Sequence, residues 1–128
     1  YQTPAIYQGL MSILREIHQE HKPIIINGGD TFITEAIKQN AISGIVTGVN
    51  QESVFTEIHF KTNTFGVKSA AEREYFFEYL AQCKTYGLTV YLLEYGATKK
   101  LTEEIKAYCE RNGFTYDISY SVELDKLF

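Results

Sequence analysis

The chain has 128 residues, of which 45% are hydrophobic and 22% are charged, and this composition predicts one globular domain with a buried core rather than a disordered tail. Its formal net charge is −4, with acids and bases interspersed, so no basic stripe is present to follow a phosphate backbone, and nucleic acid is excluded as an expected partner. No apolar stretch approaches the ~18 residues that span a bilayer, so no membrane span is expected.

The chain begins without Met, in YQTPAIYQGL, a segment that lacks the charged start and the apolar run of an export signal. This beginning is typical of a piece excised from a longer protein. We therefore expect residues 1–128 to form a single domain that is one fragment of a larger one.

Helical spacing of apolar residues predicts an amphipathic helix from Tyr7 to Glu20, with Leu10, Leu14 and Ile17 on its inner side. A short apolar strand then covers residues 24–26 and turns at Asn27, Gly28 and Gly29. Asp30 occupies the position expected of a helix N-cap before TFITEAIKQN.

The second strand is predicted over residues 42–49 and is followed by a loop of about twenty residues. Ser69 and Glu72 have the spacing of a capping box and predict the start of the next helix, which should end near Gly87. LTVYLLEYG is the third strand, TKKLTEEIKAYCERNG is a helix that ends at Gly113, and FTYDISY is the fourth strand. We expect Cys83 and Cys109, both on these helices, to be buried thiols without a disulfide.

This alternation of helices and near-continuous apolar strands predicts an α/β fold with a parallel sheet and crossover helices. Two architectures fit such repeated βα units: a complete four-stranded open sheet, or half of a closed barrel, which needs eight strands and about 250 residues.

Polar side chains follow each predicted strand. In a parallel sheet the carboxyl ends of all strands meet at one edge, so we expect these groups to lie close together. They are Asn27 with Gly28 and Gly29, then Asn50, Gln51 and Glu52, then Glu94 with Tyr95, and finally Ser119 with Tyr120.

Two carboxylates on neighbouring strand ends, Glu52 and Glu94, could come within the ~5 to 9.5 Å that glycosidases use for acid/base work. The segment NGGD has neither the Lys of a phosphate loop nor a dinucleotide fingerprint, and no set of metal ligands is recognised, so no cofactor or metal is expected. Structural roles remain open for each group: Asn27 could satisfy turn backbone, Glu52 could be a solvated acid, and Glu94 could form a salt bridge.

In order along the chain, IIINGG, SGIVTGVNQESVF, AEREYFFEYL, GLTVYLLEY and GFTYDIS resemble the C-terminal half of the TIM-barrel glycoside hydrolases typified by endo-α-1,4-polygalactosaminidase. The resemblance runs from about Leu10 to Leu124, and the motifs that support it most strongly are NGG and QES. It implies an α/β fold of parallel βα units, the second half (strands five to eight) of a (β/α)8 barrel.

The resemblance also implies roles. Glu52 would match the catalytic glutamate after the sixth strand, and Asn27 the site asparagine after the fifth. The partner aspartate would lie upstream of this chain, and Glu94 stands where relatives often have an aspartate. We predict Glu52 as catalytic residue and, as substrate-binding residues, Asn27, Gln51, Glu94, Tyr95 and Tyr120.

By resemblance, the full protein would be an exported or cell-envelope bacterial enzyme that acts on a polysaccharide containing galactosamine or a related sugar. The fragment alone should be inactive, and it should pair with the missing N-terminal half of the barrel or with another copy. A competing hypothesis is a non-enzymatic carbohydrate-binding or regulatory module. A nucleotide binder of the flavodoxin type is disfavoured, because the chain has no phosphate-cradling loop.

Overall fold

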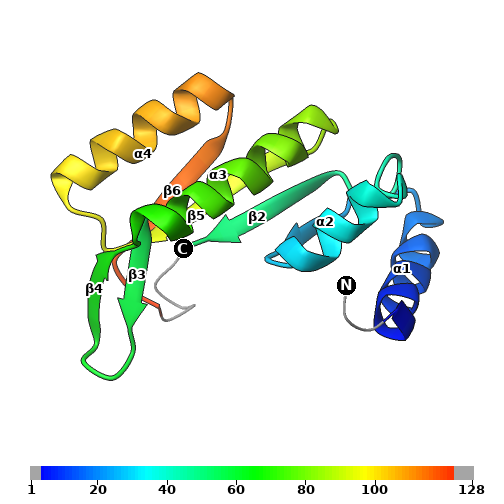
Figure 1. Cartoon of the computed structure of the whole chain (residues 1–128), viewed down its shortest axis with the longest axis horizontal. Helices are drawn as coiled ribbons and strands as arrows, with labels where there is room; N and C mark the ends of the chain where they lie inside the picture. The colour runs from blue at the N-terminus through cyan, green and yellow to red at the C-terminus, as the bar shows by residue number, and fades with distance from the viewer. Residues whose placement is uncertain (1–3, 123–128) are drawn as a thin grey trace.

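The computed structural model describes residues 4–122 and has one layer of parallel strands. The strands are β1 (Ile25–Asn27), β2 (Gly48–Glu52), β5 (Thr89–Tyr95) and β6 (Thr115–Ser119), in the order β1-β2-β5-β6. The helices are α1 (Pro4–His18), α2 (Asp30–Lys38), α3 (Ala70–Thr85) and α4 (Lys99–Asn112). Figure 1 shows the strands following one another across the sheet, with helices running alongside them.

All three pairings in this sheet are parallel, and strands that are successive in the chain are neighbours in the sheet, apart from the inserted hairpin described below. A doubly wound sheet reverses its strand order at a switch point, and this sheet has no reversal. Right-handed crossovers in a single direction place every connecting helix on the same side. The predicted α/β fold of parallel βα units is therefore confirmed, and the order is that of a barrel segment rather than of a nucleotide-binding sheet.

The core lies between the helices and one face of the sheet, here called the covered face, to which Val49, Val90 and Leu92 contribute. Side chains alternate along a strand, so Asn50, Tyr91 and Leu93 point to the opposite face, here called the open face. Every helix contributes buried residues to the core, among them Met11, Ile33, Leu80 and Ile105.

Helix α1 contacts the core through Tyr7 and Met11 rather than through the predicted inner row. Leu14 is partly buried, but Leu10 and Ile17 are 40% and 44% exposed. The apolar residues of α1 form two rows, and helical spacing alone does not say which row meets the core.

The caps of the helices are only partly as predicted. Ser69 and Glu72 form the predicted capping box of α3, and Gly113 caps α4 in the left-handed conformation. Asp30 is not an N-cap: the N-cap of α2 is Gly29, at φ 72°, and no side chain bonds to that end. Because two glycines precede it, the chain turns through backbone freedom, and Asp30 instead accepts a hydrogen bond from the hydroxyl of Tyr75.

Strand β2 begins later than predicted. Residues 42–46 form a turn in which the N–H of Val46 bonds to the carbonyl of Ile42, although both side chains are buried in the core. A buried turn is as apolar as a buried strand, so the apolar pattern predicted a strand here. The strand itself runs from Gly48 to Glu52.

The predicted long loop contains an antiparallel hairpin, β3 (Thr56–His59) and β4 (Thr64–Val67), which lies beyond the tip of β2 (Figure 1). Its Phe65 ring packs on Gly96, just after β5; an added Cβ there would lie 2.2 Å from that ring. Gly96 also has φ +60°, so glycine is required both for the contact and for the backbone. Cys83 and Cys109 are buried and unpaired, as predicted.

Candidate functional site

The carboxyl ends of the strands bring two asparagines together on the open face. Asn27 and Asn50 are register partners on β1 and β2, so their side chains point the same way. The amide nitrogen of Asn50 donates to the side-chain oxygen of Asn27 at 2.8 Å. Asn27 thus lies on the open face at the strand ends, next to the neighbouring strand's polar residues.

Glu52 is the last residue of β2 and has the same orientation as Asn50, two residues earlier. Its carboxylate is exposed and accepts a hydrogen bond from the hydroxyl of Tyr95 at 3.0 Å. Burial of Tyr95 and, as a smaller cause, its hydrogen bond to Glu52 raise the pKa of the phenol to about 12. Tyr95 is therefore a neutral donor at physiological pH and holds one carboxylate oxygen of Glu52.

Gln51 lies on the covered face, because it alternates with Asn50 and Glu52. Its side chain is 9% exposed; the amide nitrogen donates to the backbone carbonyl of Glu52 at 3.2 Å, and its oxygen has no partner. This placement argues against the predicted substrate contact of Gln51.

Glu94 also lies on the covered face, with 0% exposure. Its carboxylate accepts backbone N–H groups from Val54 at 2.6 Å, from Phe55 at 3.0 and 3.1 Å, and from Thr56 at 3.1 Å, and it accepts the Thr56 hydroxyl at 3.1 Å. Burial raises the pKa of this carboxyl, and the backbone N–H groups oppose that rise. A buried carboxylate with five such contacts holds backbone in place, so its placement argues against the predicted contact with sugar hydroxyls.

Glu52 and Glu94 point to opposite faces because of their places in the alternation of side chains along the paired strands. In the register of β2 and β5, Glu52 pairs with Leu93, so Glu94 points the other way. The two glutamates are neighbours along the rim but belong to opposite faces, and the predicted approach of their carboxyl groups does not occur across a single face.

Tyr120 follows β6 and is 69% exposed. Its hydroxyl donates to the carbonyl of Ala97 at 3.4 Å, in the segment after β5. The structure thus brings Asn27, Glu52, Tyr95 and Tyr120 to the carboxyl ends of the four strands, and turns Gln51 and Glu94 inward.

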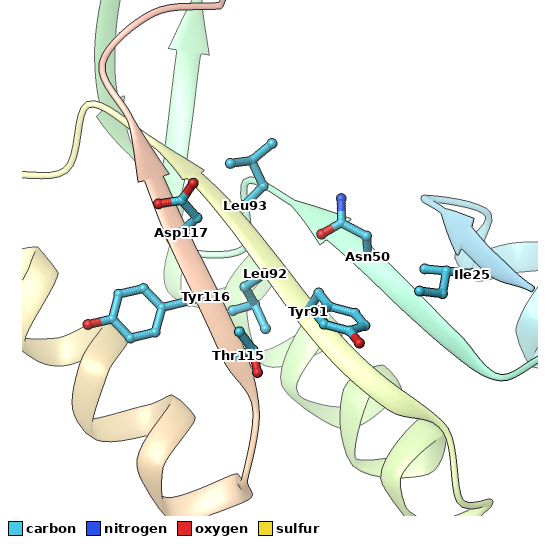
Figure 2. A pocket seen from close by; sticks show the side chains of 8 residues that line it. All are labelled: Ile25, Asn50, Tyr91, Leu92, Leu93, Thr115, Tyr116 and Asp117. Carbon is cyan, nitrogen blue, oxygen red and sulfur yellow. The ribbon is translucent and has the colours of Figure 1, made fainter. Parts of the chain in front are cut away.

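The open face also carries an acid that the sequence reasoning missed, Asp117, which is the register partner of Leu93. A hollow of about 310 Å³ runs across this face; Asp117, Leu93, Tyr91 and Asn50 are among the residues that line it (Figure 2). Asp117 could have been found by counting back two residues from Ser119 along β6.

Within residues 4–122, no three His, Cys, Asp or Glu side chains gather in a way that could hold a metal ion. In the same part of the chain, no helix is both long and apolar enough to cross a membrane.

The chain matches no protein-family model and no curated protein. Among solved structures, it is similar to the glycoside hydrolase domain of PelA from Pseudomonas aeruginosa, with a TM-score of 0.66 and 16% sequence identity. A glutamate-to-alanine variant of that domain gives a TM-score of 0.66 at 15% identity. In both cases the match covers 88% of this chain and 44% of the other, so this chain spans less than half the length of these neighbours.

At such identities the likeness concerns the fold. Together with the single layer of helices and the unreversed strand order, it confirms the predicted α/β half barrel.

Proposed function

We propose that this chain is the Glu52-bearing half of a glycoside hydrolase barrel. The observation that carries the proposal is the exposed carboxylate of Glu52 at the carboxyl end of β2, on the open face, with Tyr95 as a fixed donor. Enzymes with (β/α)8 barrels place their catalytic groups at this end of the strands. The similarity to a glycoside hydrolase domain supports the same class of reaction.

In this proposal Glu52 is the general acid or acid/base, and an aspartate outside this chain is the second carboxylate. Asn27 and its bonded neighbour Asn50 orient sugar hydroxyls from β1 and β2. Tyr95 orients Glu52, and the exposed ring of Tyr120 offers a face on which a sugar can stack.

The substrate we propose is a polysaccharide that contains galactosamine or a related amino sugar, and the full protein would be exported by a bacterium or held at its cell envelope. Both statements rest on the family resemblance of segments such as SGIVTGVNQESVF.

Two apolar surfaces of the chain support the proposal that further βα units complete the barrel. Ile6, Leu10, Ile13 and Ile17 form an apolar stripe on α1, each at least 40% exposed. The stripe continues into a hollow of about 300 Å³ next to β1, one of the two edge strands of this sheet, and the open face carries the hollow of about 310 Å³. We propose that the other βα units, or a second copy of this chain, cover these surfaces.

The test is a digestion screen with the full-length protein on amino-sugar polymers. Glu52→Gln should lower turnover by at least about 100-fold while the protein stays folded, since the substitution keeps the shape and removes the acid. Glu110→Gln removes an exposed glutamate on α4, away from the open face, and should retain wild-type turnover.

Near-normal hydrolysis by Glu52→Gln would remove the catalytic assignment. Tight binding of the polymers by the wild type with no cleavage under any condition would instead favour the carbohydrate-binding module.

A further inference from the structure

The segment that follows Glu52 is held by a carboxylate that the proposed reaction does not use. The N–H of Ser53 bonds to the carbonyl of Leu93 at 2.9 Å, and Ser53 has a φ of 57°, so the chain turns sharply over the end of β5. Glu94 then receives the backbone N–H groups of Val54, Phe55 and Thr56 at 2.6 to 3.1 Å. All these partners are donors, which makes the segment a cradle for a buried carboxylate.

A second set of bonds leads from this cradle back to the open face. The Thr56 hydroxyl donates to Glu94 at 3.1 Å and accepts the backbone N–H of Tyr95 at 3.0 Å. The Tyr95 hydroxyl donates to Glu52 at 3.0 Å. Glu94, Thr56 and Tyr95 thus form a continuous path that begins on the covered face and ends at the exposed carboxylate.

We propose that Glu94 is a positioning residue for Glu52, acting through Thr56 and Tyr95. This inference rests on the proposed function, in which Glu52 touches the substrate. Glu94 fixes the chain segment that directly follows Glu52. It also bonds to the Thr56 hydroxyl, which fixes the backbone of Tyr95, the residue that donates to Glu52. The position of Glu52 therefore depends on this buried carboxylate both through its own backbone and through Tyr95. A reacting group needs this kind of support, because a misplacement of about 1 Å can cost about 100-fold in rate.

Thr56 offers the sharpest test. Thr56→Val has nearly the same volume but lacks the hydroxyl, so it breaks the bonds to Glu94 and to the Tyr95 N–H and leaves the backbone N–H groups of the cradle in place. Thr56→Ser keeps the hydroxyl and should restore the connection. Glu57→Gln is a matched control on the next residue, whose carboxylate lies 3.5 Å from His59 and takes no part in the path.

In the full-length protein we expect Thr56→Val to lower kcat by about 10- to 100-fold with KM nearly unchanged, because Glu52 is displaced while the other substrate contacts remain. Thr56→Ser should recover most of kcat, and Glu57→Gln should equal the wild type. If Thr56 only stabilised the fold, Thr56→Val would reduce the amount of folded enzyme. Its kcat per folded molecule would then equal that of the wild type, and Thr56→Ser would have no kcat to restore.

A crystal structure of unliganded Thr56→Val tests the inference without any activity. The Glu52 carboxylate should move away from Tyr95, whereas in Thr56→Ser it should stay in place. If Glu52 does not move in Thr56→Val, the inference is overturned, whether or not the wild type hydrolyses a glycan. If Glu52 moves in Thr56→Val but the wild type is inactive, only the proposed function is overturned. If Thr56→Val does not fold, Glu94→Gln serves for the same two measurements, with the same expected displacement and loss of kcat.

Discussion

The two faces of the sheet treat the same kinds of side chain differently. On the covered face, Glu94 is fully buried and all its bonds go to backbone N–H groups and one hydroxyl. On the open face, Glu52 and Asn50 are accessible, and their bonds go to other side chains, Tyr95 and Asn27. The two glutamates thus have different roles: Glu94 holds backbone, whereas Glu52 is available to a ligand, and the difference follows the face rather than the residue type.

The largest expected contrast is between the two glutamates. Glu94→Ala leaves three backbone N–H groups and the Thr56 hydroxyl without their acceptor, so we expect it to lower the free energy of unfolding by about 3–5 kcal/mol. Glu52→Ala, on the open face, should change it by no more than about 0.5 kcal/mol. Urea denaturation of both variants in the full-length protein measures the difference, and equal losses would mean that the two faces do not differ as described.

Only half of this contrast could be predicted from the sequence. Parallel strands deliver their ends to one edge, and that rule placed Asn27, Glu52, Tyr95 and Tyr120 at the rim. The rule says nothing about which face a residue occupies, since a shift of one residue in register reverses every side chain. Glu94 follows Leu93, the partner of Glu52, and this one-residue difference decides its role.

The next contrast uses the adjacent leucines of β5. Leu92 is 2% exposed on the covered face, and Leu93 is half-buried on the open face. We expect Leu92→Ala to lower the free energy of unfolding by about 3 kcal/mol in both the 128-residue chain and a longer protein, because it opens a cavity in a packed core.

Leu93→Ala should cost about 1 kcal/mol or less in the isolated 128-residue chain, because this side chain is only half-buried there. Its cost should approach that of Leu92→Ala in the longer protein that we propose, whose further βα units would cover the open face. Denaturation of both proteins provides the comparison, and a Leu93→Ala cost that does not change between them would argue that this face stays open in the longer protein.

The fold was more accessible to sequence reasoning than the limits of its elements. Alternating helices and apolar strands are a strong signal, and they gave the correct class. Residues 42–46 were misread as strand because a buried turn is as apolar as a buried strand. The β3–β4 hairpin was missed because TEIHFKTNTFGV alternates weakly, and because most of it is exposed beyond the sheet.

A smaller effect separates the starts of two helices. The Ser69 hydroxyl accepts the N–H of Glu72 at 3.2 Å, and the Glu72 carboxylate accepts the N–H of Ser69, whereas the N-cap of α2, Gly29, offers no side-chain hydrogen bond. Ser69→Ala should therefore lower the free energy of unfolding by about 1 kcal/mol. Glu72→Gln keeps a capping-box residue and should lose only part of this amount; a loss in Glu72→Gln equal to that in Ser69→Ala would show that charge, not geometry, dominates this cap.

The smallest effect is a pH dependence, and it concerns the covered face alone. Burial raises the pKa of Glu94 above its ordinary value of 4.5, so between these two values the native protein holds a proton that the unfolded chain releases. The stability that this group contributes is complete below pH 4.5 and is lost as the pH rises through the native pKa. Glu94→Gln does not titrate, so the free energy of unfolding of the wild type relative to this variant should fall as the pH rises above 4.5, as urea denaturation at several pH values would measure. The pair of wild type and Glu110→Gln controls for the removal of one carboxylate from the surface. A difference that rises with pH would mean that the N–H groups of Val54, Phe55 and Thr56 stabilise the ionised carboxylate by more than burial destabilises it.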